Sequence, residues 1–268
     1  VQDNDLQGHE LPAIAVASQA AGTILGNRLE GNEGYGILVR DSAQPTVEGN
    51  RLLRNRHSQS NGPDATRARA QRTARPLPDQ GTLGNRRAAI AVVDQAAGFV
   101  RGNVLDGNGG YGILVSHAAW PRVESNWLRR HERPAVAVLG DSACEVLGNH
   151  LEDNQGYGIV VAENAKPTVA DNELSGHAMP AIAVRGRAEG TLRGNVLRGN
   201  KSYGVVVSGS ARPLLEGNRL EGHELPAVAV MEQAAGTVTG NRVEDSKGYG
   251  MVISGSARPL VESNGFSR

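Results

Sequence analysis

Both tryptophans and two of the histidines gather in one short segment, and side chains of these types can recognise or process a sugar. His117, Trp120 and Trp127 follow one another there, and Asp94 occupies the place equivalent to His117 one internal repeat earlier. An aromatic ring offers a flat contact surface, and an acid beside an imidazole can transfer a proton. Asp94 and His117 are thus candidates for an acid/base pair, and no other residue is predicted to be catalytic. Drift of solvent-facing positions would produce the same pattern without a function.

Histidine and asparagine also alternate from repeat to repeat in one column of the sequence, which invites comparison with a metal site. The column contains His131, Asn154, His177, Asn200 and His223, and His9 fits the same spacing. If each repeat stacks on the next at about 4.8 Å, successive histidines lie about 9.6 Å apart. A shared zinc ion needs ligand nitrogens about 2.0–2.1 Å away. We therefore predict an alternating His/Asn hydrogen-bond ladder, and neither a metal nor a cofactor.

The elements that position these residues follow from the internal repeat. The pair Tyr-Gly, followed by aliphatic residues, recurs at all five tyrosines, and an Ala-Ile/Val-Ala-Val segment lies midway between them. The tyrosines are Tyr35, Tyr111, Tyr157, Tyr203 and Tyr249. With the Gly after each Tyr, or the first Ala of the other segment, as position 1, ten coils with a 23-residue period begin at residues 13, 36, 89, 112, 135, 158, 181, 204, 227 and 250.

Three columns of this repeat predict how the coils fold. Position 15 is asparagine in every coil, from Asn27 to Asn264, and positions 12 and 17 are always apolar. Coils of this length are too short for paired helices, and their β-branched residues favour strands that stack on the next coil. A buried amide can bond to backbone and to the same amide one coil away. We predict an all-β parallel β-helix of about 10–11 coils, roughly 50 Å long, with an internal Asn ladder.

The repeats resemble those of the right-handed parallel β-helix family, of the single-stranded, pectin-lyase-like kind. The resemblance is carried by segments such as Gly36-Ile37-Leu38-Val39 and Gly217-Asn218-Arg219-Leu220, and it covers nearly the whole chain. Such repeats occur in polysaccharide lyases and epimerases, in periplasmic proteins of copper-enzyme maturation and in the substrate-binding region of certain F-box proteins. The resemblance implies the fold and slightly favours an extracellular or periplasmic location. The Asp-Pro-His-Asp signature associated with alginate epimerases is absent.

Composition limits the partners. The formal net charge is zero, so the basic footprint of a nucleic-acid-binding protein is missing. No apolar run approaches the length of roughly 18 residues that a spanning helix needs, which predicts no membrane span. The single cysteine, Cys144, excludes an internal disulfide. We expect one domain over residues 1–268.

Residues 56–85 interrupt the repeat and are rich in arginine. They are either an exposed loop or an eroded extra coil, and we favour one irregular coil with an Arg-rich loop. Guanidinium groups there could recognise an anionic ligand or an acidic partner. Asp41 is also a candidate ligand-binding residue, because it shares position 6 of the repeat with Asp94 and His117. The predicted ligand-binding set is therefore Asp41, Asp94, His117, Trp120, Trp127, Arg67, Arg69 and Arg72.

Position 3 of each coil should point outward, and its column carries almost no charge. Its larger members are Leu38, Leu114, Val160, Val206 and Val252. Such a stripe is suited to self-association or to a protein partner, unless a loop or an N-terminal segment covers it.

Two functions remain. One is a scaffold that binds a protein or a glycan through its lateral faces without catalysis. The other is a polysaccharide lyase, epimerase or hydrolase with a site near coils 3 and 4.

Overall fold

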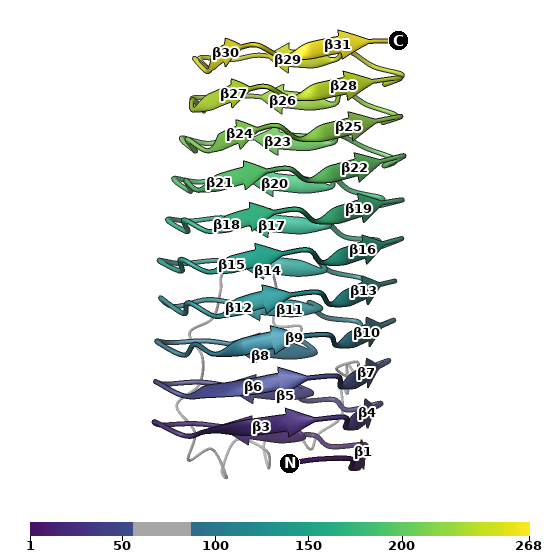
Figure 1. Ribbon diagram of the computed structural model, residues 1–268, viewed down its shortest axis with the longest axis vertical. Helices are drawn as coiled ribbons and strands as arrows, with labels where there is room; N and C mark the ends of the chain where they lie inside the picture. Colours follow the sequence, from purple (N-terminus) through teal and green to yellow (C-terminus); the bar gives the residue numbers. More distant parts are fainter. Residues whose placement is uncertain (56–86) are drawn as a thin grey trace, which may run out of the picture.

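The computed structural model describes residues 1–55 and 87–268, and within them the chain winds into a stack of three-stranded coils (Figure 1). The strands of successive coils form three parallel sheets, named A, B and C here, of 10, 11 and 10 strands. Each coil places its first strand in sheet C, its second in sheet A and its third in sheet B. The predicted all-β parallel solenoid is confirmed.

Short strands make up all three sheets. Sheet C contains β2 (Ile14–Val16), β5 (Ile37–Val39), β8 (Ile90–Val92), β11 (Ile113–Val115), β14 (Val136–Val138), β17 (Ile159–Val161), β20 (Ile182–Val184), β23 (Val205–Val207), β26 (Val228–Val230) and β29 (Met251–Ile253). Sheet A contains β3 (Ala21–Leu25), β6 (Gln44–Glu48), β9 (Phe99–Arg101), β12 (Arg122–Glu124), β15 (Glu145–Leu147), β18 (Thr168–Ala170), β21 (Thr191–Arg193), β24 (Leu214–Glu216), β27 (Thr237–Thr239) and β30 (Leu260–Glu262). Sheet B contains β1 (Asp5–Gln7), β4 (Arg28–Glu30), β7 (Arg51–Leu53), β10 (Val104–Asp106), β13 (Trp127–Arg129), β16 (His150–Glu152), β19 (Glu173–Ser175), β22 (Val196–Arg198), β25 (Arg219–Glu221), β28 (Arg242–Glu244) and β31 (Gly265–Ser267).

The stack continues directly across the interruption in the repeat. Strand β5 pairs with β8, so that Ile37 lies opposite Ile90, and β7 pairs with β10 in the register of the other coils. The second and third coils are therefore neighbours. Residues 56–86 lie outside the described residues, and so do the two readings of that segment as a loop or a coil.

Each complete coil turns at three bends, and each bend uses at least one residue with a left-handed backbone. In the second coil these residues are Asp41, Gly49 and Arg54, with φ of 60°, 62° and 50°. Glycine is common at the three positions because it has no Cβ to clash in this conformation. The bends fix which side chains of the flanking strands point inward.

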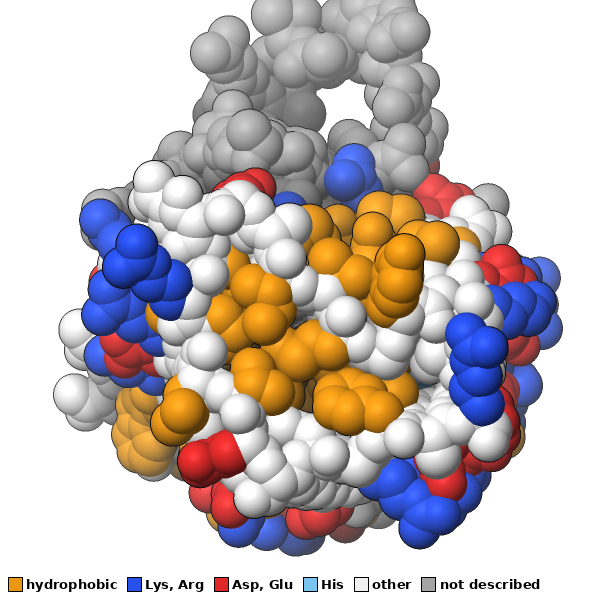
Figure 2. All heavy atoms as spheres, turned by 90° about the horizontal axis from the view of Figure 1, so that it is seen from above, with side chains coloured by type: hydrophobic (Ala, Val, Ile, Leu, Met, Phe, Trp, Pro, Cys, Tyr) orange, Lys and Arg blue, Asp and Glu red, His pale blue; other side chains and the backbone are white. Residues whose placement is uncertain are grey.

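The interior is a narrow column of small aliphatic side chains. Ile159, Val161, Val169 and Leu174 of one coil are almost completely buried, and Ala165 fills the corner between sheets C and A. Viewed along the stack from the C-terminal end, hydrophobic side chains gather in the middle and charged side chains surround them (Figure 2). This explains how a folded chain manages with 3% aromatic residues.

The predicted Asn ladder is confirmed at position 15. The backbone N–H and the side-chain Nδ2 of Asn126 both donate to Oδ1 of Asn149, each at 3.0 Å. Asn149 donates in turn to Oδ1 of Asn172, and its Nδ2 also reaches the carbonyl oxygen of Val123 at 3.0 Å. Each buried amide thus satisfies backbone groups at a bend where no strand ladder can do so.

The His/Asn column forms a second ladder at position 20. The backbone N–H of Asn154 donates to Nδ1 of His177 at 3.3 Å, and the N–H of His177 donates to Oδ1 of Asn200 at 3.0 Å. Burial lowers the pKa of His131 to about 4, of His177 to about 3 and of His223 to about 4. The three rings are therefore neutral near pH 7.

No helix among the described residues is long and apolar enough to span a bilayer.

The Asn ladder yields the first prediction. Asn149→Leu should destabilise the fold, because both donors of Asn126 would lose their acceptor and Asn172 would lose its side-chain donor at a buried bend. Each unsatisfied buried group costs about 1–3 kcal/mol. The control is Asn4→Leu at the exposed end of the same ladder, which should cost less. Chemical denaturation measures both, and equal losses would contradict the ladder's energetic role.

The buried histidines yield the second prediction. In the unfolded chain they bind protons below about pH 6.5, but in the folded protein only near pH 4 or below. The unfolded state therefore holds more protons between these values, and the free energy of unfolding should fall as the pH drops from 6.5 toward 4.

Replacing His131, His177 and His223 together by asparagine, the residue of the alternate coils, should remove that part of the pH dependence. Thermal unfolding of both proteins across this pH range is the measurement. Parallel curves for the wild type and the triple variant would show that the histidines do not contribute.

Candidate functional site

The two tryptophans of the fourth coil lie on different sides of the molecule. Trp120, 55% exposed, lies in the turn between β11 of sheet C and β12 of sheet A, close in sequence to His117. Trp127, 43% exposed, lies on β13 of sheet B, after β12 and the next bend. The sequence grouped these residues as one site, whereas the structure divides them between a turn and a sheet face.

Asp41, Asp94 and His117 all occupy position 6, where the backbone is left-handed, with φ of 60°, 62° and 56°. Oδ2 of Asp41 accepts a hydrogen bond from the backbone N–H of Ser18, one coil earlier, at 3.1 Å. Glu232 does the same for the N–H of Gly209 at 2.7 Å. Acidic side chains at this position therefore support the turn of the preceding coil, which gives Asp41 a structural contact.

His117 lies one coil beyond Asp94, because β8 and β11 pair in register. Its Nδ1 lies 2.9 Å from the hydroxyl oxygen of Ser116. An acid/base role for Asp94 and His117 stays a prediction. The remaining predicted ligand-binding residues, Arg67, Arg69 and Arg72, lie outside the described residues.

The predicted outward stripe of sheet C points away from the coil interior but is not uniformly exposed. Val160 belongs to an apolar cluster separate from the core that contains its neighbours Ile159 and Val161. Leu38 is 8% exposed and Val160 is fully buried, whereas Leu114, Val206 and Val252 are half-buried. Leu38 and Val160 are therefore covered, as the alternative of a covered stripe expects, and a contact through the stripe stays a prediction.

The described residues bring the richest set of exposed functional groups together on sheet B. Positions 16 and 18 point outward there, and the apolar residue between them points inward, as in Trp127-Leu128-Arg129, where Leu128 is buried. Parallel register stacks Trp127 against His150, and Arg129 between Asp106 and Glu152. We name this set the Trp127 cluster; it comprises Asp106, Trp127, Arg129, Arg130, His150, Glu152 and Glu173.

The indole of Trp127 is held by two neighbours. The imidazole of His150 meets it edge-on, with ring centroids 5.8 Å apart and an interplanar angle of 82°. The guanidinium carbon of Arg129 lies 5.1 Å from the indole centroid, within the range of a cation–π contact. The ring is therefore oriented on a rigid sheet while nearly half of its surface remains open to solvent.

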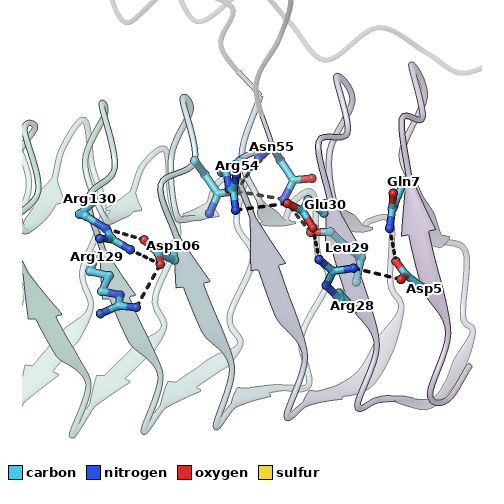
Figure 3. A network of polar contacts seen from close by, with 11 residues as sticks. Asp5, Gln7, Arg28, Leu29, Glu30, Arg54, Asn55, Asp106, Arg129 and Arg130 are labelled. Carbon is cyan, nitrogen blue, oxygen red and sulfur yellow. Dashed lines mark hydrogen bonds and ion pairs between the residues drawn. The ribbon is translucent and has the colours of Figure 1, made fainter.

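The carboxylate of Asp106 holds both arginines of the Trp127 cluster (Figure 3). Arg130 contacts both oxygens of Asp106, with Nε 2.8 Å from Oδ1, and Nη2 of Arg129 lies 3.1 Å from Oδ2. Partial burial alone would raise the pKa of Asp106, but the hydrogen bonds and charges of Arg130 and Arg129 outweigh it and lower the pKa. Arg130 adopts a left-handed backbone, with φ of 56°, an uncommon conformation for a residue with a side chain. Asp106 is therefore a fixed anion that positions both arginines.

His150 bridges two carboxylates. Its Nδ1 lies 3.2 Å from Oε2 of Glu173, and its Nε2 lies 3.3 Å from Oε2 of Glu152. Ionised carboxylates only accept hydrogen bonds, so both contacts are hydrogen bonds only when both ring nitrogens carry protons. The ring is therefore held between a carboxylate of its own strand and one of the next strand.

The cluster offers recognition rather than metal chemistry. Among the described residues, no group of three or more His, Cys, Asp or Glu side chains is placed to hold a metal ion. An exposed indole surrounded by fixed donors and acceptors can bind a ligand with an apolar face and polar edges, as a sugar ring has.

Sequence reasoning named only Trp127 from this cluster. The missed residues could have been found from the repeat itself, because Val104, Trp127, His150 and Glu173 occupy position 16 of successive coils. The same period aligns Asp106, Arg129 and Glu152 at position 18.

Comparison with known proteins identifies the fold. A double mutant of the periplasmic alginate epimerase AlgG superposes with a TM-score of 0.63 at 13% identity, covering 91% of this chain and 69% of that one. The A-module of the Azotobacter vinelandii mannuronan C-5 epimerase AlgE6 gives a TM-score of 0.53 at 15% identity, covering 98% and 83%. No curated protein matches the sequence. At these identities the likeness shows the fold alone.

A family model described as "right handed beta helix region" matches residues 1–143 and 134–268. Because the two matches together span the whole sequence and the strands stack as that family requires, the chain belongs to the right-handed β-helix family.

Proposed function

We propose that the protein binds a glycan through the outer face of sheet B, centred on Trp127, without catalysing a reaction. The observation that carries the proposal is the half-exposed indole, oriented by His150 and Arg129 on a rigid sheet. Aromatic rings supply much contact area at small entropic cost, and a ring that is already oriented loses little freedom on binding.

The polar neighbours of the ring suit hydroxyl groups. Carboxylates of Glu152 and Glu173 accept hydrogen bonds, and the guanidinium of Arg129 donates them. These groups follow the stack from coil to coil, because β13, β16 and β19 are adjacent strands. A polymer lying along the stack would therefore meet the indole and then successive acceptors, as a polysaccharide chain requires.

A second candidate is a polysaccharide-processing enzyme, and the fold likeness to two alginate epimerases favours it. In that case Asp94 and His117 are the candidates for the acid and the base. A protein partner bound through Leu114, Val206 and Val252 is a further role for the scaffold. An extracellular or periplasmic location accompanies the proposal, since one of the similar structures is a periplasmic protein.

The proposal predicts that Trp127→Ala weakens polysaccharide binding by about tenfold or more, equivalent to about 1.4 kcal/mol. Trp120→Ala is the matched control, because it removes an equally exposed tryptophan from the same coil but from another face. Affinity electrophoresis in gels containing soluble polysaccharides measures both variants. If the two variants lose the same binding, or if the wild type binds none of the polymers, the proposal fails.

The enzymatic alternative has its own test. His117→Ala should leave binding intact but lower turnover by about 10²-fold if His117 is a general acid or base. Release of unsaturated or epimerised product from a panel of uronic-acid polymers is the readout. Absence of any turnover by the wild type leaves binding as the function.

A further inference from the structure

The charges of the Trp127 cluster are unevenly divided. Asp106, Glu152 and Glu173 contribute three carboxylates, whereas Arg129 and Arg130 contribute two guanidiniums. His150 balances the difference only when it is protonated. With His150 charged or neutral, the side chains around the indole therefore carry no positive excess that could attract an acidic ligand.

Both guanidiniums are already engaged. Arg130 is bound to the two oxygens of Asp106, and Arg129 contacts Asp106 at 3.1 Å and Glu152 at 3.7 Å while its guanidinium lies over Trp127. The Nε atom of Arg129 has no hydrogen-bond partner among the described residues, but it is buried and does not face a ligand. A ligand carboxylate would therefore compete with an existing ion pair for either arginine.

Neighbouring arginines on sheet A do not change this balance. Arg101 is paired with Glu48 at 2.9 Å, and Arg122 is paired with both Glu124 and Glu145. The carboxylates, by contrast, include the most exposed charged group of the cluster, since the Glu173 side chain is 64% exposed. An exposed carboxylate that is not paired with an arginine therefore lies two strands from the ring, at Glu173.

We infer that the Trp127 cluster selects an uncharged polysaccharide and disfavours polymers that carry carboxylates or sulfates. The inference rests on the proposed function and specifies its ligand class. Hydroxyl groups can donate to Glu152 and Glu173 without repulsion, whereas a uronate would bring a like charge within a few ångströms of both. Selectivity of this kind arises from the unfavourable contact as much as from the favourable one.

The experiment measures binding of the purified protein to uncharged polymers (hydroxyethylcellulose and galactomannan), acidic polymers (alginate and polygalacturonate) and a cationic one (diethylaminoethyl-dextran). Binding is measured at pH 7.5 in 0.15 M salt, with Trp127→Ala beside the wild type in every case. The expected result is Trp127-dependent binding of an uncharged polymer at least tenfold stronger than that of either acidic polymer. Trp127-dependent binding of an acidic or cationic polymer that equals or exceeds that of the uncharged polymers would overturn the inference and leave the proposed function standing.

A pair of charge variants tests the cause. Glu152→Gln combined with Glu173→Gln should strengthen binding of the acidic polymers several-fold, most clearly at low salt, where charges are less screened. Binding of the uncharged polymer should change by less than about threefold, because glutamine still offers an acceptor. The control combines Glu221→Gln and Glu244→Gln, which remove the same charge from β25 and β28 of the same sheet.

Three further outcomes would overturn the inference on ligand charge, and the last of them would also overturn the proposed function. An equal gain in both double variants would mean that overall charge, and not the Trp127 cluster, sets the preference, which overturns the inference. No gain in either variant also overturns it. Failure of every polymer to bind in a Trp127-dependent manner overturns the proposed function, and the inference with it.

Discussion

The whole structure depends on one hydrogen-bonded contact that is repeated from coil to coil. At each bend between sheets A and B, an asparagine receives two N–H donors from the coil before it and passes two to the coil after it. The bend would otherwise leave buried backbone groups without partners, since strand pairing stops there. The ladder therefore fixes both the spacing of the coils and the residue at which sheet B begins.

The surface chemistry follows from that constraint. Because sheet B starts one residue after each ladder asparagine, positions 16 and 18 face solvent and position 17 faces the core. Side chains at the same position of neighbouring coils are then held at strand spacing by the backbone itself. Trp127, His150 and Glu173 meet for this reason, although they are far apart in sequence. A binding surface on such a sheet is preorganised by main-chain hydrogen bonds and needs no separate support.

Much of the fold could be predicted from the sequence, because the repeat shows each inward position many times, as for the Asn column and the buried His177. Outward positions vary from coil to coil, so no single repeat shows that His150 bridges two carboxylates. Trp120 and Trp127 do not form one site, because the bend after β12 places Trp127 on sheet B, away from the turn that contains Trp120. Val160 points outward as its position requires and is nevertheless buried. The period of the repeat predicts whether a side chain points inward or outward. Whether an outward side chain is exposed to solvent depends on what packs against that face of the sheet.

The interruption after β7 shows how the stack tolerates added sequence. The last described residue before it, Asn55, is buried in the second ladder, and after it Ile90 of β8 occupies the register that an uninterrupted repeat would give. Extra residues at the corner between sheets B and C therefore do not change how the coils stack. Every complete coil has an equivalent corner, so an insertion at such a corner can leave the alignment of the three sheets unchanged.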